Sequence, residues 1–172
     1  MEMGIRAWRM EDACDLALAV NNKKVLDNLR DGLPYPYTCA DAEEYIKAMM
    51  EAPADSTFAW AITLDDRAIG SIGIFRKDNI HRCTAEMGYY IAESYWGRGI
   101  GSEAVKLACA YVFANTDIVR IFAEPFATNL ASCRILEKAG FVLEGALRKN
   151  AVKNGVVLDM RMYGLVKGEE TL

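Results

Sequence analysis

Metal-binding side chains are scarce in this sequence, which has one histidine, His81, and five cysteines without a CxxC pair. A zinc site of cysteine and histidine needs several ligands at short spacing, so we expect no metal. The odd number and wide spacing of the cysteines also argue against a disulfide framework. Cys14 and Cys109 lie in apolar stretches, where we expect each to be a small buried side chain.

Long apolar runs and clustered positive charge are also missing. No apolar segment approaches the ~18–20 residues of a membrane-spanning helix, and the N-terminus lacks a signal-peptide pattern. The 20 basic and 24 acidic residues give a net charge of −4, whereas nucleic-acid binding needs a clustered positive surface. We therefore expect a cytoplasmic protein with neither a membrane nor a nucleic-acid partner. The mild negative balance is compatible with an amine substrate.

The composition is that of an ordinary globular protein. The chain has 172 residues, of which 52% are hydrophobic and 26% charged, close to the globular average. No linker or internal repeat divides it, and one domain is the usual count for this length. We therefore predict a single domain over residues 1–172.

Hydrophobic periodicity predicts alternating blocks of helix and strand. The alternation of Phe58, Trp60 and Ile62 with smaller residues is typical of a half-buried strand. Thr38, with Asp41 three residues later, is an N-cap signature, and Asn154-Gly155 favours a type I′ hairpin turn. The predicted strands cover residues 3–8, 58–64, 68–76, 83–92, 118–123, 141–152 and 156–166, and the predicted helices begin near residues 10, 23, 38, 100 and 129. This order indicates an α+β domain with a mixed, mostly antiparallel sheet of about seven strands flanked by about four helices.

The most informative segment is a glycine-rich loop between the predicted strand over residues 83–92, the third strand of an antiparallel meander, and the helix that begins at Ile100. The amides at a helix N-terminus lack intrahelical partners and favour anions, and glycine lets a phosphate approach the backbone closely. The loop therefore predicts a pyrophosphate cradle, although a tight strand-to-helix turn would explain the glycines equally well. A P-loop and a dinucleotide fingerprint are both excluded, because Gly-Lys-Ser/Thr is absent and Ser102 stands where the third glycine would be.

A second segment adds specificity to the glycine loop. It carries Asn129, Ser132, Gly140 and Phe141, and together the two segments resemble the Gcn5-related N-acetyltransferase (GNAT) superfamily. The family's R/Q-x-x-G-x-G/A form corresponds here to Trp96-Gly97-Arg98-Gly99-Ile100-Gly101. Trp96 replaces the usual Gln or Arg, as in the branch of ribosomal-protein N-terminal acetyltransferases. The resemblance extends from Met3 to Val166.

The resemblance implies a site for acetyl-CoA as cosubstrate, in a sheet that is splayed in the middle. Its pantetheine arm would pair with the open edge of the third meander strand, and Asn129 would contact the cofactor arm in addition to capping its helix. The residues implied in cofactor binding are Tyr90, Ile91, Ala92, Arg98, Gly99, Ile100, Gly101, Ser102 and Asn129.

The resemblance also implies direct attack of an amine on the thioester, which needs a base for the amine proton. Glu124 and Glu86 are the two candidates, each on a predicted strand among apolar neighbours; an ion pair with Arg82 or Arg120 is the structural alternative. Ser132 is the candidate acid for the departing thiolate, because Leu136 occupies the place of the family's usual tyrosine.

The acceptor pocket is expected to involve the irregular segment 28–37. Arg30, Tyr35 and Tyr37 are its candidate substrate-binding residues, by charge or by cation–π contact, although the tyrosines could instead cover the core. We expect the acceptor to be a primary amine, at a protein or peptide N-terminus or on a small molecule such as a polyamine, amino acid or drug. The alternatives are a CoA-binding module without catalysis and a dinucleotide-dependent enzyme. A homodimer is compatible with the sequence.

Overall fold

The seven predicted strands form one mixed sheet in the order β1-β2-β3-β4-β5-β7-β6. The computed structural model describes residues 1–170, so the last two residues of the predicted domain lie outside it. Neighbouring strands run antiparallel except β4 and β5, which are parallel. The strands are β1 Met3–Arg6, β2 Thr57–Leu64, β3 Arg67–Arg76, β4 Thr84–Ile91, β5 Arg120–Ala123, β6 Val142–Lys153 and β7 Val156–Val166.

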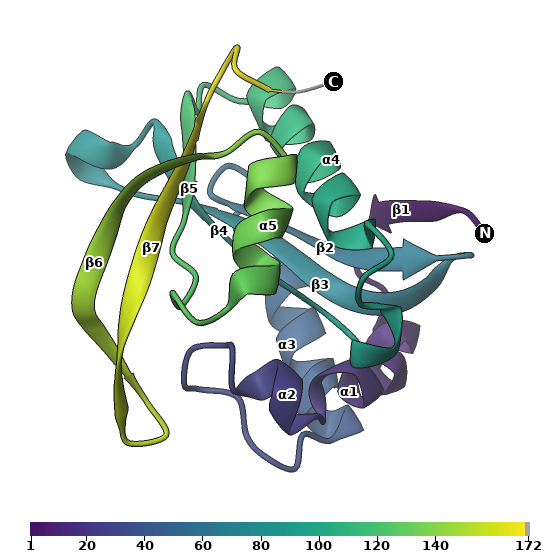
Figure 1. Cartoon of the computed structure of the whole chain (residues 1–172). Helices are drawn as coiled ribbons and strands as arrows, with labels where there is room; N and C mark the ends of the chain where they lie inside the picture. The colour runs from purple at the N-terminus through teal and green to yellow at the C-terminus, as the bar shows by residue number, and fades with distance from the viewer. Residues whose placement is uncertain (171–172) are drawn as a thin grey trace.

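The helices cover both faces of this sheet and confirm the predicted α+β class. They are α1 Ala13–Val20, α2 Lys23–Leu26, α3 Cys39–Glu51, α4 Ile100–Asn115 and α5 Leu130–Lys138. One apolar core forms between the sheet and α4 with α5, and a second forms between the opposite face and α1 with α3 (Figure 1). The β6–β7 hairpin curves away from the rest of the sheet at the left of this view.

The predicted helix starts and the hairpin turn are confirmed. Thr38 and Asp41 form a reciprocal capping box at α3, and Asn129 accepts a hydrogen bond from the Ser132 N–H at the start of α5. Asn154 and Gly155 both have positive φ, 51° and 76°, as a type I′ turn requires. Short-range sequence signals therefore set these boundaries correctly.

Two details differ from the sequence prediction. The sequence predicts a short helix from Lys23 to Arg30, but the helix ends at Leu26. The Asn28 side chain donates to the Lys24 carbonyl, in place of the main-chain N–H that a longer helix would supply. A disulfide joins Cys14 and Cys39, whose Cα atoms lie 4.8 Å apart, and Cys14 is exposed rather than buried. The pairing arises because α1 packs against α3, a tertiary contact that cysteine spacing does not encode. Cys109 is buried, as expected.

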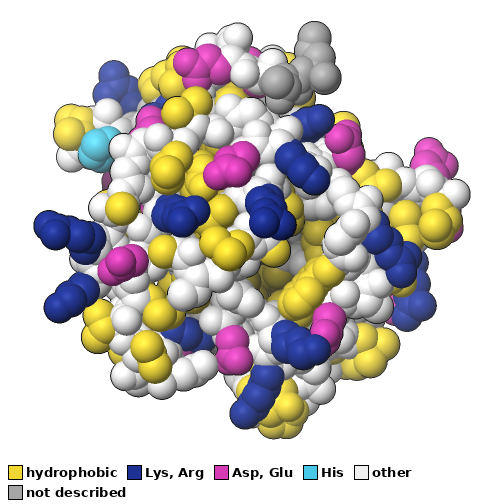
Figure 2. All heavy atoms as spheres, viewed as in Figure 1, with side chains coloured by type: hydrophobic (Ala, Val, Ile, Leu, Met, Phe, Trp, Pro, Cys, Tyr) yellow, Lys and Arg dark blue, Asp and Glu magenta, His cyan; other side chains and the backbone are white. Residues whose placement is uncertain are grey.

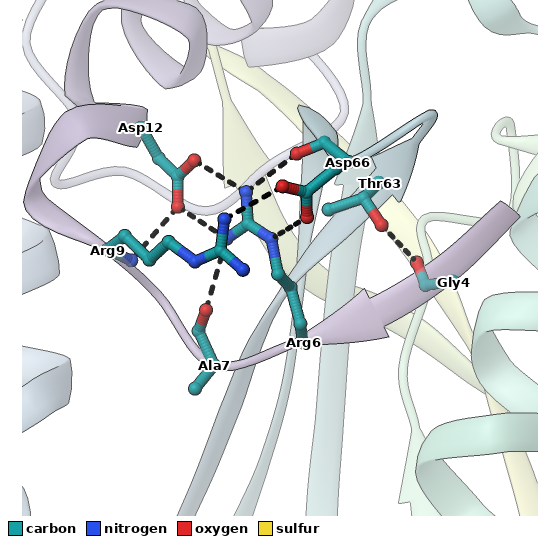
Figure 3. Close-up of polar contacts among 7 residues, drawn as sticks. All are labelled: Gly4, Arg6, Ala7, Arg9, Asp12, Thr63 and Asp66. Carbon is teal, nitrogen blue, oxygen red and sulfur yellow. Dashed lines mark hydrogen bonds and ion pairs between the residues drawn. The ribbon is translucent and has the colours of Figure 1, made fainter. Parts of the chain in front are cut away.

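A charged cluster fixes the first strand to the first helix and to the β2–β3 turn (Figure 3). Arg6 donates two hydrogen bonds to the Asp12 carboxylate, at 2.7 and 2.8 Å, and a third to Asp66 at 2.8 Å. Desolvation works to raise the pKa of the Asp12 carboxyl, but the bonds from Arg6 and from the Arg9 N–H outweigh it and lower that pKa. Ionised Asp12, with a side chain only 8% exposed, therefore stabilises the fold.

We predict that Asp12→Asn lowers the free energy of unfolding by about 2–3 kcal/mol at pH 7, because it breaks a largely buried charge-assisted pair. A lowered folded-state pKa contributes stability above the unfolded value, about 3.9, and that stability is lost as the pH falls. The deficit of the variant should therefore shrink below about pH 4, which urea unfolding at pH 7 and pH 3 would measure. Asp117→Asn is the control, because Asp117 pairs with Arg76 while 72% exposed. A deficit that is the same at both pH values would contradict this account.

Candidate active site

The glycine-rich loop joins the end of β4 to the start of α4. Gly97 and Gly99 have φ values of +75° and +78°, in the left-handed region that favours glycine. Gly99 is the N-cap of α4 and makes no side-chain capping bond, so the first N–H groups of the helix have no partner from a capping side chain. Arg98 is exposed beside them, stacked over the Tyr95 ring at 5.4 Å.

The third glycine of the loop has a different structural role. Gly101 is buried in the first turn of α4, where a Cβ would lie 2.6 Å from the Cδ1 of Ile135 on α5 and 3.4 Å from the Cδ1 of Ile91 on β4. Any larger residue at this position would force the Ile135 side chain to shift. Ser102, also buried, turns its hydroxyl back onto the Gly99 carbonyl at 2.9 Å. Their main-chain N–H groups, rather than their side chains, are therefore what these two residues can offer a ligand.

The sheet opens directly beside this loop. β4 and β5 pair from Thr84 to Glu86, and within residues 1–170 the rest of β4 is paired only with β3. The predicted splay is therefore present, and it leaves one edge of β4 without a strand from residue 87 onward. An edge of this kind is a template for hydrogen bonds from an extended ligand.

The register decides which residues can use that edge. The Ala92 N–H donates to the Ile69 carbonyl at 2.9 Å, on the β3 side. Because the main-chain groups of successive residues point to alternate sides of a strand, those of Tyr90 also face β3, whereas Met87, Tyr89 and Ile91 face the open edge. Of the three residues predicted to pair with a pantetheine arm, Ile91 alone presents main-chain groups there. Tyr89 was not among the cofactor-binding residues predicted from the sequence. The two-residue alternation of a strand would have pointed to it, because Tyr89 lies two residues before Ile91 on the same side of β4.

Trp96 ties the loop to the strand. Its indole Nε1 donates to the Ile91 carbonyl at 2.8 Å, so the side chain occupies one acceptor of the open edge and fixes where the loop leaves β4. This hydrogen bond is a physical reason for tryptophan at position 96, where the family usually has Gln or Arg. It also leaves the Ile91 N–H and both main-chain groups of Tyr89 as the nearest groups for an extended ligand.

A hydroxyl pair lies between β4 and α5. The Tyr89 hydroxyl is 2.7 Å from Ser132 Oγ, and either atom can be the donor; it also donates to the Ser132 carbonyl at 3.2 Å. Burial raises the pKa of the Tyr89 phenol, which keeps it protonated at neutral pH. Leu136, one turn farther along α5, is completely buried in the core. Leu136 thus offers no hydroxyl where the family usually has a tyrosine, whereas Tyr89 on β4 places a phenol next to Ser132.

The two candidate bases lie close together. One nitrogen of Arg30, Nη2, hydrogen-bonds to Glu86 Oε1 and lies 3.7 Å from Glu124 Oε2. The carboxylate side chains are 17% and 21% exposed, whereas the Arg30 side chain is 64% exposed. Lys77 approaches Glu86 from the other side, at 3.3 Å.

The alternative ion pairs of Glu86 or Glu124 with Arg82 or Arg120 are not formed within residues 1–170. Arg120 instead binds Glu144, with a hydrogen bond of 2.8 Å, and Arg82 donates to the Asn79 carbonyl. Adjacency in the chain suggested the wrong partners, because Arg30 is 56 residues away from Glu86.

A hollow of about 280 Å³ adjoins these charged groups. It is lined by residues that include Arg30, Glu124, Phe126, Asn150, Lys153 and Met160. Two contacts hold the α2–α3 loop against the β6–β7 hairpin at its rim: Lys153 Nζ to Asp31 at 2.9 Å and Asn154 Nδ2 to Asp27 at 3.0 Å. The expected acceptor region is thus an open hollow, bordered by the loop, the strand ends and the hairpin.

The predicted substrate-binding tyrosines do not share this position. Tyr37 is 4% exposed and packs in the second core, and desolvation raises its pKa to about 12. Tyr35 is exposed, with Lys23 Nζ 5.6 Å from its ring centroid, and it is not among the residues lining the hollow. Of the three predicted residues, Arg30 is the one at the hollow.

Surface charge, potential metal ligands and helix hydrophobicity of the described residues also bear on the site. Basic and acidic side chains are interspersed over the face shown in Figure 2, which is hollowed near its centre, with hydrophobic side chains at the hollow. Residues 1–170 contain no group of three potential metal ligands. None of their helices combines the length and apolarity needed to cross a membrane.

Comparison with known proteins agrees with this architecture. The model of a family described as "Acetyltransferase (GNAT) domain" matches residues 2–142. The chain is 39% identical over 106 residues to Probable N-acetyltransferase YjcK of Bacillus subtilis (strain 168), covering 62% of this chain and 59% of that protein. It is 28% identical over 102 residues to the ribosomal-protein-serine acetyltransferase of Escherichia coli (strain K12), covering 59% and 56%. The aligned region thus spans less than two thirds of these relatives.

A solved structure extends the likeness to nearly the whole fold. Mycobacterium smegmatis RimJ in complex with CoA-disulfide superposes with a TM-score of 0.86, covering 97% of this chain and 83% of that one, at 22% sequence identity. At this identity the likeness shows the fold. Together with the family match over most of the sequence, it shows that the chain belongs to the GNAT acetyltransferase family.

Proposed function

We propose that the protein transfers the acetyl group of acetyl-CoA to a primary amine, by direct attack in a ternary complex. One observation carries this proposal: the unpaired edge of β4 is joined by the glycine-rich loop to the N-terminus of α4. Glu86 lies where that edge begins, and Glu124 shares its contact with Arg30. A pantetheine arm needs such an edge, a pyrophosphate needs such a helix start, and an attacking amine needs a base.

The main chain would provide most of the cosubstrate contacts. The N–H groups of residues 98–102 are proposed to hold the pyrophosphate, with Arg98 adding a charge-assisted contact. The pantetheine amides would pair with the free groups of Tyr89 and Ile91, and Asn129 would contact the cofactor arm while it caps α5. When bound, acetyl-CoA supplies the activated acetyl group.

The amine must lose a proton to attack the thioester carbonyl. Glu124 and Glu86 are proposed for this task, because both contact the same nitrogen of Arg30 and Arg30 lines the acceptor hollow. Glu124 borders the hollow itself, which makes it the first candidate. Glu86 lies on β4 next to the same Arg30 nitrogen and would act with Glu124 as one charged unit.

The departing thiolate needs a proton, and Ser132 is proposed to deliver it. An isolated serine hydroxyl is a weak acid. The bond to Tyr89 offsets this weakness, because the phenol 2.7 Å away can donate to Ser132 Oγ and stabilise the negative charge left when the serine gives its proton to the thiolate. The serine would regain a proton from solvent as the product leaves.

The proposed acceptor is the N-terminal amine of a protein or peptide. The E. coli relative whose name specifies a ribosomal-protein serine supports this choice, as does an open hollow bordered partly by an irregular loop and a hairpin, which an extended chain can enter from the surface. A small-molecule amine acceptor and a non-catalytic CoA-binding module are the competing readings. A homodimer remains a prediction.

We predict that Gly99→Glu abolishes CoA binding while the fold is retained. A Cβ at this position meets nothing within 4 Å, so the added carboxylate would project beside the helix N-terminus and repel a diphosphate. Gly99→Asn is the matched control, because asparagine tolerates positive φ and adds no charge. Isothermal titration calorimetry with CoA should show little or no binding to the Glu variant and a smaller loss for Asn. Unchanged affinity in the Glu variant would refute the cradle.

We predict that Glu124→Gln and Glu86→Gln lower kcat more than they weaken acetyl-CoA binding, because an amide cannot accept the amine proton. Loss of a general base costs about 10²–10⁴-fold, and the larger effect is expected at the residue that is the base. The measurement is the pH profile of kcat/KM, whose decline at low pH should change in that variant.

Ser132→Ala is the comparison for these two variants. It should lower kcat while the low-pH decline stays as in the wild type, because it removes the acid rather than the base. If neither glutamine variant changes the profile, both base assignments fail.

An acceptor screen tests the function itself. Release of CoA thiol from acetyl-CoA should be fastest with short peptides that carry a free N-terminus, compared with the same peptides blocked at the N-terminus, with a polyamine and with free amino acids. Preference for the polyamine or an amino acid would favour the small-molecule reading. Tight CoA binding with no turnover on any amine would favour the non-catalytic module. NAD(P) binding without CoA binding would refute the proposed acetyl transfer and favour a dinucleotide-dependent enzyme.

A further inference from the structure

The position of Arg30 leads beyond the proposed function. Its single nitrogen Nη2 contacts both carboxylates at once, Glu86 by a hydrogen bond and Glu124 at 3.7 Å. A point that one guanidinium nitrogen can share between two carboxylates is also a point that one ammonium nitrogen can share, since an ammonium has three N–H donors. The hollow that Glu124 lines leads to the same point.

We propose that the Nη2 position of Arg30 is the binding point of the acceptor ammonium, and that Arg30 is a specificity-determining gate which the acceptor must displace. The inference rests on the proposed function, and it specifies the charge of the group that enters. It also changes the role of Arg30 from a residue that holds the acceptor to one that competes with it.

The loop that carries Arg30 is suited to such displacement. The Arg30 side chain is mostly exposed, and an exposed ion pair is a weak contact that a competing cation can replace. Asp31, the next residue, is anchored to Lys153 on the hairpin. With the bond from Asn154 to Asp27, this makes two contacts between the loop and the hairpin that do not involve Arg30, so the guanidinium can swing out without breaking them.

The charge of the binding point narrows the acceptor class. Two carboxylates within reach of one nitrogen attract a cation and repel an anion. An amine that carries its own carboxylate next to the nitrogen, as a free α-amino acid does, brings an anion into this field. A peptide N-terminus or a polyamine does not. The point therefore selects amines that have no adjacent negative charge.

The experiment removes the gate and supplies a substitute. Arg30→Ala should lower KM for the best amine acceptor by about two- to fivefold, the scale of one partly exposed ion pair, with CoA affinity unchanged. Ethylguanidinium at millimolar concentration should then inhibit the variant competitively against the amine, and should inhibit the wild type about two- to fivefold more weakly, because Arg30 competes for the same point. Tetramethylammonium, which has no N–H donor, is the ionic-strength control.

Lys77→Met is the matched control variant. Lys77 pairs with Glu86 at 3.3 Å, so this change removes a cation from one carboxylate without opening the shared point, and it should create no sensitivity to ethylguanidinium beyond that of the wild type. Adding Glu124→Gln to Arg30→Ala should abolish ethylguanidinium binding in calorimetry, a measurement that needs no turnover.

The outcomes separate the gate from the function. A raised KM in Arg30→Ala would show that Arg30 holds the acceptor and would overturn the proposal, as would equal ethylguanidinium binding to variant and wild type. Ethylguanidinium binding to Arg30→Ala without acetyl transfer to any amine would support the cation site while refuting the proposed function.

Discussion

The divergence of β4 from β5 after Glu86 is the constraint on which the rest of the site depends. Three residue pairs hold the two strands together, and beyond them β4 keeps a free row of main-chain donors and acceptors. Continued pairing would have left no place for an extended ligand. Instead the opening leaves a strand edge that begins beside Glu86 and is joined by the glycine-rich loop to the N-terminus of α4.

Much of this arrangement could be predicted from the sequence, because its signals are local. The caps at Thr38 and Asn129 and the Asn154-Gly155 turn act over a few residues, and all of them appear in the structure. Strand alternation located β2, but the strand is not half-buried as predicted, because helices cover both faces of the sheet and Ala61 and Ile62 are both buried. The parts that could not be predicted depend on tertiary contacts. The Cys14–Cys39 disulfide and the pairing of Arg30 with both glutamates join residues 25 or more positions apart, and no short-range pattern reports such contacts.

The glycine loop shows how one motif serves two physical demands. Gly97 and Gly99 are needed for backbone conformation, since both have positive φ in open space. Gly101 is needed for packing, since a Cβ there would collide with Ile135. The motif is thus specific partly because the turn and the α4–α5 contact must both be satisfied. Trp96 adds a third requirement by bonding to the Ile91 carbonyl, which fixes the loop relative to the open edge.

Arg30, Glu86 and Glu124 also meet two demands at once, the stability of the free protein and the binding of a cation. Glu86 and Glu124 would repel each other if left alone at the edge of the core, and Arg30 offsets that repulsion in the absence of an acceptor. A cation brought by the acceptor can do the same when it takes the place of Arg30. The carboxylates therefore keep a positive partner in both states, and because the exchange swaps one cation for another, the net charge of the site changes little. An anionic acceptor would have no equivalent exchange, so under the proposed displacement selectivity for amines would follow from the same charge balance that stabilises the free protein.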